Sequence, residues 1–220
     1  VNHFDNTMFG TVGPAIEGME IKIAEDGEVL ARGHAIMKGY YLRDDLTAET
    51  IDADGWFHTG DIGEILGGRF LKITDRKKEI FKTAGGKYIA PQTIENKFKE
   101  TPLVEQVMVL GENRKFPAAL IVPNFVALKV WAGKKGITYT TDEEMIKNAE
   151  VLEKFNKIVE LSCKDFGKWE QVKRFALLPK QWSIDGGELT PKLSLKRKVV
   201  LEKNAALIDK IYLDAEGYKG

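Results

Sequence analysis

The chain has 220 residues, 43% of them hydrophobic, which is enough to bury one large core or two modest ones. Its 33 Lys and Arg residues balance its 33 Asp and Glu residues, so no overall charge favours a nucleic acid or an anionic membrane as a partner. Cys163 is the only cysteine, which excludes a disulfide within the chain, and the three histidines are too scattered to indicate a metal site.

The first 75 residues are typical of β-structure. Residues 19–23 alternate apolar and polar side chains, as a half-buried strand does, and the Asp-Gly pair after them predicts a tight turn. The same reasoning predicts strands over residues 29–32, 62–66 and 70–74 and a short helix over residues 44–51. We expect a β-barrel-like piece with Trp56, Tyr40 and Tyr41 packed in its core.

The remainder of the chain predicts a small α+β domain. Pro91 is well placed to begin a helix that runs to about residue 100, and apolar residues at helical spacing give the clearest helix over residues 150–163. The pattern further predicts strands over residues 104–110, 118–122 and 172–178 and helices over residues 125–134, 142–147 and 197–210. Because polar residues interrupt the strand pattern at residues 75–78, we expect a domain boundary there.

Residues 55–61 read Gly-Trp-Phe-His-Thr-Gly-Asp, which predicts Asp61 on a Gly-flanked turn. A carboxylate can accept hydrogen bonds from the two adjacent hydroxyls of a ribose, as acidic residues do in dinucleotide folds. Thr59 and Gly60 would hold the turn and let a nucleotide come close. The alternative is a loop aspartate that caps its own turn, and spacing alone favours that alternative.

Basic residues form two clusters in this neutral chain, which suits a ligand with phosphates at more than one place. The clusters are Lys72, Arg76, Lys77, Lys78, Lys82 and Lys87, and Lys192, Lys196, Arg197, Lys198 and Lys203. The guanidinium of Arg76 could bridge a ribose hydroxyl and a phosphate oxygen with its planar fork. Two solvated basic faces, with Arg76 a surface arginine, are the alternative.

These segments together resemble the AMP-forming acyl-CoA synthetases of the adenylate-forming superfamily, in particular the long-chain fatty-acid–CoA ligases. The resemblance rests on the Thr-Gly-Asp segment, on Asp-Arg-Lys-Lys-Glu at 75–79, on Gly85-Gly86 and on Gly-Glu-Leu-Thr-Pro-Lys-Leu-Ser-Leu-Lys-Arg at 187–197. It implies that Asp61, Arg76 and Thr59 bind the nucleotide and that Lys78 is the hinge. Gly85 and Gly86 would line the coenzyme A channel.

The resemblance also implies a catalytic lysine in the terminal motif. Many relatives carry Gly before this lysine, whereas Leu195 precedes Lys196 here, and Ser194 stands where some long-chain members carry another lysine. We favour Lys196 because Arg197 follows it, and Lys192 is the alternate. The third interpretation of either lysine is a basic start of the last helix. A lysine there opposes the helix dipole, which favours a role other than structure.

The implied reaction forms an acyl-adenylate from a fatty acid and ATP with Mg²⁺, and then a thioester with coenzyme A. Residues 1–75 would end the large adenylation domain, residues 76–79 would form the hinge, and residues 80–220 would form a C-terminal α+β lid domain. The chain begins at Val1 in mid-pattern and lacks the family's phosphate-binding loop and acyl tunnel. We therefore expect the last third of such an enzyme, inactive by itself, with no metal ligands of its own.

Two other function classes stay open. One is a non-catalytic module of the same fold that binds coenzyme A or a partner protein; the other is nucleic-acid binding, which the balanced charge disfavours. No apolar run approaches transmembrane length and there is no signal-peptide pattern. We expect a cytoplasmic protein, and association of the full-length protein with a membrane surface also stays open.

Overall fold

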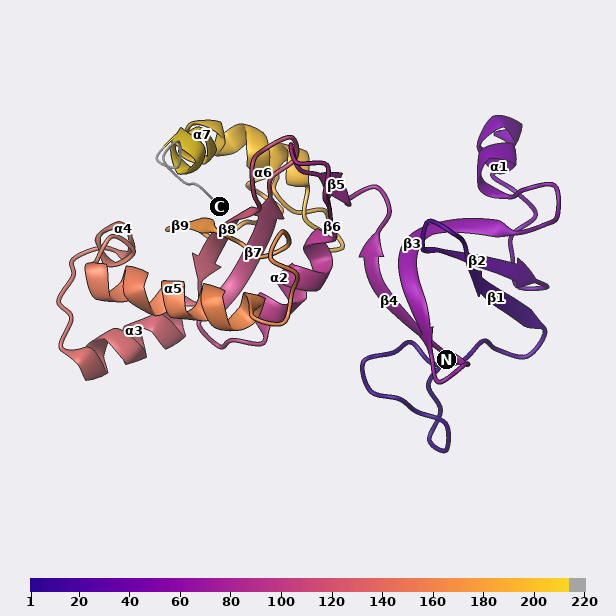
Figure 1. Ribbon diagram of the computed structural model, residues 1–220, viewed down its shortest axis with the longest axis horizontal. Coiled ribbons are helices and arrows are strands. Elements are labelled where there is room, and N and C mark those ends of the chain that lie inside the picture. The colour runs from indigo at the N-terminus through magenta and orange to yellow at the C-terminus, as the bar shows by residue number, and fades with distance from the viewer. Residues whose placement is uncertain (214–220) are drawn as a thin grey trace. The chain divides into compact units, whose positions relative to one another are not determined.

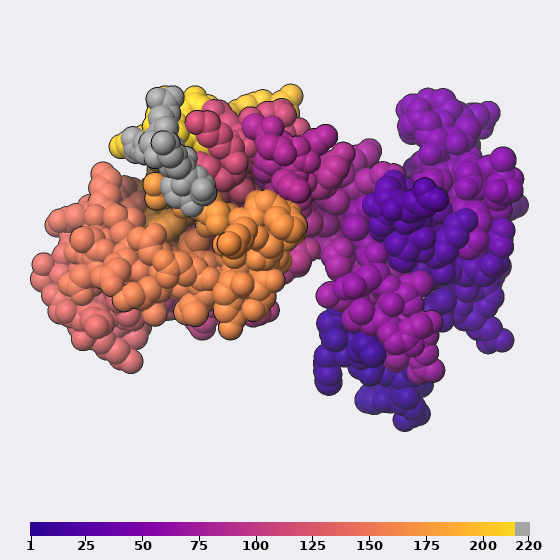
Figure 2. All heavy atoms as spheres, in the orientation of Figure 1, coloured from indigo at the N-terminus to yellow at the C-terminus, as the bar shows by residue number. Residues whose placement is uncertain are grey.

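The computed structural model describes residues 1–213, which divide between two compact units. The first is Val1–Ile80 and the second begins at Phe81. Figure 2 draws the atoms of the first unit from indigo to purple and those of the second from magenta to yellow. The division follows the expected hinge at 76–79 by one residue, and motion about that hinge stays a prediction. Among the described residues, no helix is long and apolar enough to cross a membrane.

The first unit is built on one curled, antiparallel sheet of four strands (Figure 1). In chain order the strands are β1 (Met19–Ile23), β2 (Glu28–Gly33), β3 (Phe57–Leu66) and β4 (Phe70–Arg76), and each pairs with the next. Gly27 takes the positive φ of +86° that the β1–β2 turn requires. Helix α1 (Asp44–Thr50) lies between β2 and β3 in the chain. The half-barrel shape confirms the β-barrel-like piece expected from the sequence.

Strand β3 is longer than the sequence pattern predicts and contains Thr59, Gly60 and Asp61, which we expected in a turn. The pairing of β2 with β3 runs from Leu30 opposite His58 to Glu28 opposite Ile62, so three residues of β3 face a single residue of β2. Gly60 adopts a φ of +71°, which only a glycine takes without strain. The expected turn is therefore an irregular bulge inside a strand, which leaves Asp61 without a partner on β2 while it stays paired with Arg76 on β4.

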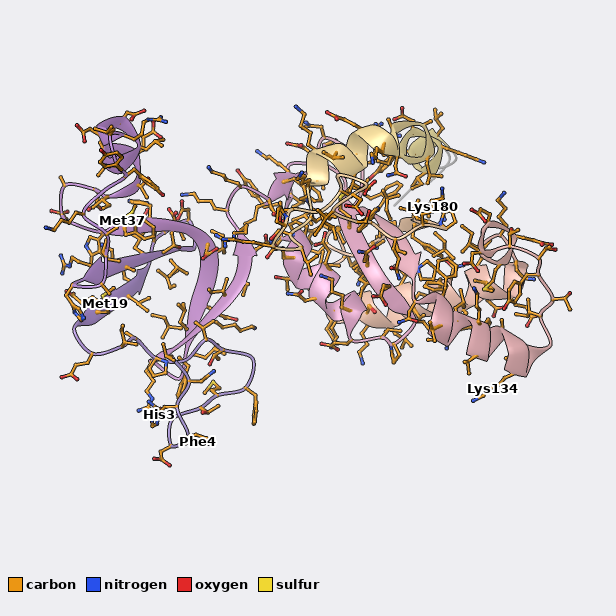
Figure 3. All side chains as sticks on the ribbon, turned by 180° about the vertical axis from the view of Figure 1, so that it is seen from behind. His3, Phe4, Met19, Met37, Lys134 and Lys180 are labelled. Atoms are coloured by element: carbon orange, nitrogen blue, oxygen red, sulfur yellow. The ribbon has the colours of Figure 1, made fainter. Side chains whose placement is uncertain are left out.

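The core of the first unit is small. Trp56 is buried as expected, and two cations cover its ring, Lys22 Nζ at 4.0 Å and Arg32 Cζ at 4.4 Å from the centroid. The expectation for the two tyrosines is wrong, because Tyr40 is 43% and Tyr41 is 90% exposed. They lie in the irregular segment between β2 and α1, outside the sheet. Figure 3 likewise shows His3 and Phe4 in the loop that precedes β1.

The second unit has a three-stranded sheet in the order β7-β8-β9. Its strands are β7 (Val104–Leu110), β8 (Ala118–Pro123) and β9 (Arg174–Leu177), with β7 antiparallel and β9 parallel to β8. A short hairpin of β5 (Phe81–Lys82) and β6 (Tyr88–Ile89) precedes the sheet. The helices are α2 (Pro91–Lys99), α3 (Phe125–Lys135), α4 (Asp142–Met145), α5 (Ala149–Cys163), α6 (Arg197–Lys203) and α7 (Ala205–Leu213).

Both faces of this sheet are buried, since β7 and β8 are apolar at nearly every position. Val107, Val109 and Ile121 face a core formed with α2, α3 and α5. Met108 and Leu120 face a second core formed with α6 and α7. Figure 1 shows α5 and α7 on opposite sides of the strands. The result is a three-layer α+β domain that confirms the expected fold class.

The final helix differs from the expectation of one helix over 197–210. The structure has two, α6 and α7, with Asn204 between them. The Asn204 amide group donates a 2.8 Å hydrogen bond to the Val200 carbonyl, an interaction that competes with continued helix. The break lets Val200 and Ile208 both reach the same core.

Candidate functional site

Asp61 and Arg76 lie opposite each other on β3 and β4. An Asp61 Oδ1 oxygen is 2.7 Å from Arg76 Nη1. The arginine side chain is 57% exposed and that of the aspartate 18%. The pair therefore stands at the surface, where a ligand with hydroxyl and phosphate oxygens can reach both groups. The sequence suggested these two residues separately. The register of β3 with β4 brings them together, and no local sequence signal encodes it.

The bulge that carries Asp61 is held by side chains as well as by the backbone. The Thr59 hydroxyl donates to the Val29 carbonyl at 2.7 Å and accepts the Asp61 N–H at 3.1 Å. The Gly60 N–H donates to a Glu28 carboxylate oxygen at 2.9 Å. These bonds satisfy backbone groups that a bulge leaves without a ladder partner. Thr59 thus shapes the position of Asp61, and its hydroxyl is engaged within the protein.

Glu28 is a residue that the sequence did not single out. Its side chain is buried and accepts hydrogen bonds from His58 Nδ1 at 3.0 Å and from Lys77 Nζ at 2.9 Å, in addition to Gly60 N–H. Lys77 also pairs with Asp26 at 2.7 Å. One carboxylate therefore contacts both stretches that carry the candidate nucleotide ligands. A buried acid beside a turn is a weak sequence signal, because its partners are fixed only by strand pairing.

The electrostatics of the two acids differ. Burial would raise the pKa of Glu28, but the hydrogen bonds from Lys77, His58 and the Gly60 N–H outweigh it, so the pKa is lowered. Burial raises the pKa of Asp61, and the nearby Glu28 charge adds to this, while Arg76 acts in the opposite direction. Arg76 therefore helps to keep Asp61 ionised and able to accept hydrogen bonds.

Lys78 lies two residues after Arg76, in a turn past the end of β4. Its side chain is exposed. Before it, the Lys77 N–H bonds to the Gly60 carbonyl at 2.8 Å, and after it the Glu79 N–H bonds to the Arg76 carbonyl at 2.9 Å. Lys78 thus lies where the sheet ends and just before the second unit begins, which is a suitable place for a hinge.

The two glycines of the β5–β6 loop have different conformations. Gly86 has a φ of +78°, whereas Gly85 has no positive φ, and a Cβ built on Gly85 would meet only Thr83 Oγ1, at 3.9 Å. The loop is closed by the Thr83 N–H, which donates to Lys87 O, and by the Gly86 N–H, which donates to Thr83 O. Turn geometry therefore explains Gly86 and leaves Gly85 without a structural requirement.

The candidate lysines occupy different parts of a hairpin formed by residues 188–196, called here the terminal hairpin. Leu189 and Leu195 form a bridge across it, and the Thr190 N–H bonds to the Ser194 carbonyl at 2.8 Å. Lys192 lies at the tip, next to Leu193 with its φ of +60°. Lys196 lies at the base, as the N-cap residue of α6, and both lysines are exposed.

The candidate residues therefore fall into two groups. Asp61, Arg76 and Thr59 belong to the first unit, whereas the Gly85-Gly86 loop and both lysines belong to the second. Among residues 1–213, no group of three or more His, Cys, Asp or Glu side chains could hold a metal ion.

Comparison with known proteins identifies the family of this chain. Residues 78–216 match the family described as the AMP-binding enzyme C-terminal domain. The chain belongs to this family. Its matched residues start at the expected hinge, Lys78, and include the Gly85-Gly86 loop and the terminal hairpin with both lysines.

The relatives of this AMP-binding C-terminal domain include long-chain ligases. Long-chain-fatty-acid–CoA ligase FadD15 of Mycobacterium tuberculosis is 36% identical over 213 residues, which are 96% of this chain and 35% of that protein. The resemblance to this group is confirmed. The chain spans about a third of the length of this relative, and the likeness extends beyond the matched domain into the first 77 residues.

Solved structures show the same fold. The A domain of carboxylic acid reductase from Segniliparus rugosus, in complex with AMP and a co-purified carboxylic acid, gives a TM-score of 0.70 at 21% identity and covers 91% of this chain and 32% of that one. O-succinylbenzoate coenzyme A synthetase from Bacillus subtilis, in complex with ATP and a magnesium ion, gives a TM-score of 0.61 at 20% identity, with 87% and 35% covered.

Proposed function

We propose that the whole protein is an ATP-dependent, AMP-forming long-chain fatty-acid–CoA ligase, to which this chain contributes nucleotide-contacting strands and a C-terminal lid domain. The observation that carries the proposal is the Asp61–Arg76 pair at 2.7 Å, which joins an acceptor for a diol on β3 with an exposed donor for phosphate at the end of β4. The identity to a long-chain ligase over 96% of the chain supports the substrate class.

In the first half-reaction, a fatty-acid carboxylate oxygen attacks the α-phosphorus of ATP and the bond to pyrophosphate breaks. Asp61 would accept hydrogen bonds from the two ribose hydroxyls. Arg76 would give up part of its contact with Asp61 and donate to the ribose and phosphate oxygens. Lys196, or Lys192 in its place, would stabilise the negative charge shared by the carboxylate and the α-phosphate. Mg²⁺ bound with ATP would neutralise phosphate charge, as in other phosphate-transfer sites.

In the second half-reaction, the thiolate of coenzyme A attacks the carbonyl carbon of the acyl-adenylate and AMP leaves. A different face of the lid domain would be needed for this step, which would follow rotation about Lys78. The Gly85-Gly86 loop would then let the pantetheine arm approach, since Gly85 has no side chain and no conformational need to be glycine. The 220-residue chain alone would form little or no acyl-CoA. We place the whole protein in the cytoplasm. A membrane surface is a second location, because the proposed substrate is a lipid.

The test compares four alanine substitutions in the protein expressed at its full natural length. Asp61→Ala and Arg76→Ala should each raise the KM for ATP by about 10- to 100-fold, the loss expected for hydrogen bonds to charged groups. The matched controls are Glu64→Ala and Lys72→Ala, which break a cross-strand ion pair of 2.9 Å on the same two strands. The controls should leave the KM within about twofold.

The reaction measured is acyl-adenylate formation, and it is monitored by the release of pyrophosphate. Equal effects of all four substitutions would contradict the proposal, because the Glu64–Lys72 pair joins the same two strands outside the proposed nucleotide site. Absence of any fatty-acid-dependent pyrophosphate release by the unsubstituted protein would favour a non-catalytic module of the same fold.

A further inference from the structure

Strand β7 lies at the edge of the second unit's sheet, and two side chains take the place of a neighbouring strand beside it. The Val109 N–H donates to a Glu95 carboxylate oxygen at 2.7 Å. The Arg197 guanidinium donates to the Val109 carbonyl. Both backbone groups of an edge residue are thus satisfied by one acid and one base, which explains how this edge can be buried.

The acid and the base also contact each other. Arg197 Nη1 lies 2.7 Å from the same Glu95 oxygen that accepts the Val109 N–H. The Glu95 side chain is 7% exposed and the Arg197 side chain 17%, so the pair is largely withdrawn from water. Loss of Arg197 would leave the buried Glu95 carboxylate without its cation, which is much more costly than loss of a surface pair.

The pair connects α2 with the start of α6, 102 residues later. Arg197 is the first residue of α6, and Lys196 is its N-cap residue. The Lys196 N–H in turn donates to the Glu188 carbonyl at 2.7 Å, across the base of the terminal hairpin. Two adjacent residues are therefore fixed in two directions, Arg197 to the sheet edge and Lys196 to the hairpin.

We propose that Glu95 is a positioning residue for Lys196, acting through Arg197 to hold the base of the terminal hairpin against the edge of β7. The part of this proposal that concerns catalysis rests on the proposed function of Lys196. A role in stability alone accounts less well for the arrangement, since buried ion pairs are often no more stabilising than apolar side chains of similar size. Fixing the backbone from which the Lys196 side chain extends is a benefit that an apolar pair would not supply.

The experiment uses the protein at its full natural length with Arg197→Met, Arg197→Lys and Glu95→Gln. Arg197→Met removes both the positive charge and the N–H donors of the guanidinium. Arg197→Lys keeps the charge alone, and Glu95→Gln keeps an acceptor for the Val109 N–H and is the mildest change. Arg114→Met is the matched control, because it breaks another long-range arginine–carboxylate pair of 2.7 Å in the same unit, with Asp209.

Two measurements separate positioning from catalysis. Hydrogen exchange of the peptide that contains residues 188–197 should accelerate by about tenfold or more in Arg197→Met and Glu95→Gln, and stay unchanged in Arg114→Met. The kcat of acyl-adenylate formation at saturating substrates should fall by about 10- to 100-fold in Arg197→Met and in Glu95→Gln. The kcat of Arg197→Lys should fall less than that of Arg197→Met. Thioester formation from supplied acyl-adenylate should be retained.

Unchanged exchange of this peptide in a variant with a lowered melting temperature would overturn the proposal and leave the pair a purely structural role. Accelerated exchange with unchanged kcat would also overturn the claim for Lys196. Failure of the proposed function has a different appearance: the unsubstituted protein would form no adenylate, while exchange would still respond to Glu95→Gln.

Discussion

The ammonium of Lys77 lies 2.9 Å from a carboxylate oxygen of Glu28, 49 residues earlier in the chain. The same carboxylate accepts hydrogen bonds from His58 Nδ1 and from the Gly60 N–H. A single buried acid therefore fixes the residues that directly precede Asp61 and directly follow Arg76. We infer that the geometry of the Asp61–Arg76 pair depends on Glu28 although Glu28 is too deeply placed to touch a ligand.

Glu28→Gln should lower the free energy of unfolding of the first unit by about 1–3 kcal/mol near neutral pH, the cost of losing the buried anion that three donors share. Because the pKa of Glu28 is lower in the folded than in the unfolded protein, its stabilisation is present above the usual glutamate pKa of about 4.3. It is lost as the pH falls through the folded pKa. The stabilities of both proteins, measured by urea unfolding, should therefore differ near pH 7, and the difference should shrink as the pH falls below about 4.3.

Glu64→Gln is the control for this measurement, because Glu64 also pairs with a lysine but is half exposed. It should change stability by no more than about 0.5 kcal/mol at either pH. A Glu28→Gln protein as stable as the unsubstituted one would show that the Lys77 and His58 contacts contribute nothing beyond what the amide can replace.

Arg76→Ala should make nucleotide binding more sensitive to acid. Burial raises the pKa of Asp61 and Arg76 opposes this, so the substitution should raise the pKa further. Only the ionised carboxylate can accept hydrogen bonds from both ribose hydroxyls. As the pH is lowered, affinity for AMP should therefore begin to fall at a higher pH than in the unsubstituted protein. A raised folded pKa also means that ionised Asp61 destabilises the fold, a cost that disappears as the pH falls.

Calorimetric titration with AMP across a pH series measures this shift. Lys72→Ala, which removes a cation four residues earlier on the same strand, should lower affinity no more than about twofold and leave the pH dependence unchanged. Parallel pH profiles for Arg76→Ala and the unsubstituted protein would mean that Arg76 does not control the ionisation of Asp61.

The terminal hairpin offers a direct choice between two lysines, one at its base and one at its tip. Lys196→Ala should reduce acyl-adenylate formation by about 10²- to 10³-fold, the usual effect of removing a group that stabilises transition-state charge. Thioester formation from supplied acyl-adenylate should survive. Lys192→Ala should have the smaller effect. Lys198→Ala is the control, as its side chain is 90% exposed two residues further along. A larger loss from Lys192→Ala would assign the role to the hairpin tip.

The sequence predicted the elements whose signal is local. Strand β7 was expected at its observed bounds because its apolar run is short and β-branched, and Pro91 correctly marked the start of α2. The Thr-Gly-Asp segment was interpreted as a turn because glycine is common there. A glycine inside a strand indicates a bulge just as well, and only the pairing with β2 decides between them.

The site was predictable only as separate residues. Asp61 and Arg76 were both singled out, but the register of β3 with β4 makes them a pair. The partners of Glu28 lie 30 to 49 residues away, and Glu95 and Arg197 are 102 residues apart. No periodicity or spacing rule encodes such contacts, because they depend on how strands and helices pack in three dimensions.

Gly85 and Gly86 allow a test of the coenzyme A channel that separates conformation from space. Gly86→Ala should destabilise the second unit by about 1–2 kcal/mol, because a φ of +78° is strained for alanine. Gly85→Ala should be neutral or slightly stabilising, since the φ of Gly85 is not positive and a Cβ there would meet only Thr83 Oγ1, at 3.9 Å. If the pantetheine arm passes over this loop, Gly85→Ala and, more strongly, Gly85→Val should nevertheless raise the KM for coenzyme A in the thioester half-reaction.

Thermal unfolding and the thioester half-reaction with supplied acyl-adenylate provide the two readouts. The adenylation half-reaction of the Gly85 variants is the internal control, because coenzyme A takes no part in it. A Gly85→Val protein with normal stability and an unchanged KM for coenzyme A would remove this loop from the channel. In that case Gly86 alone would account for the motif, as the residue that the β5–β6 turn requires.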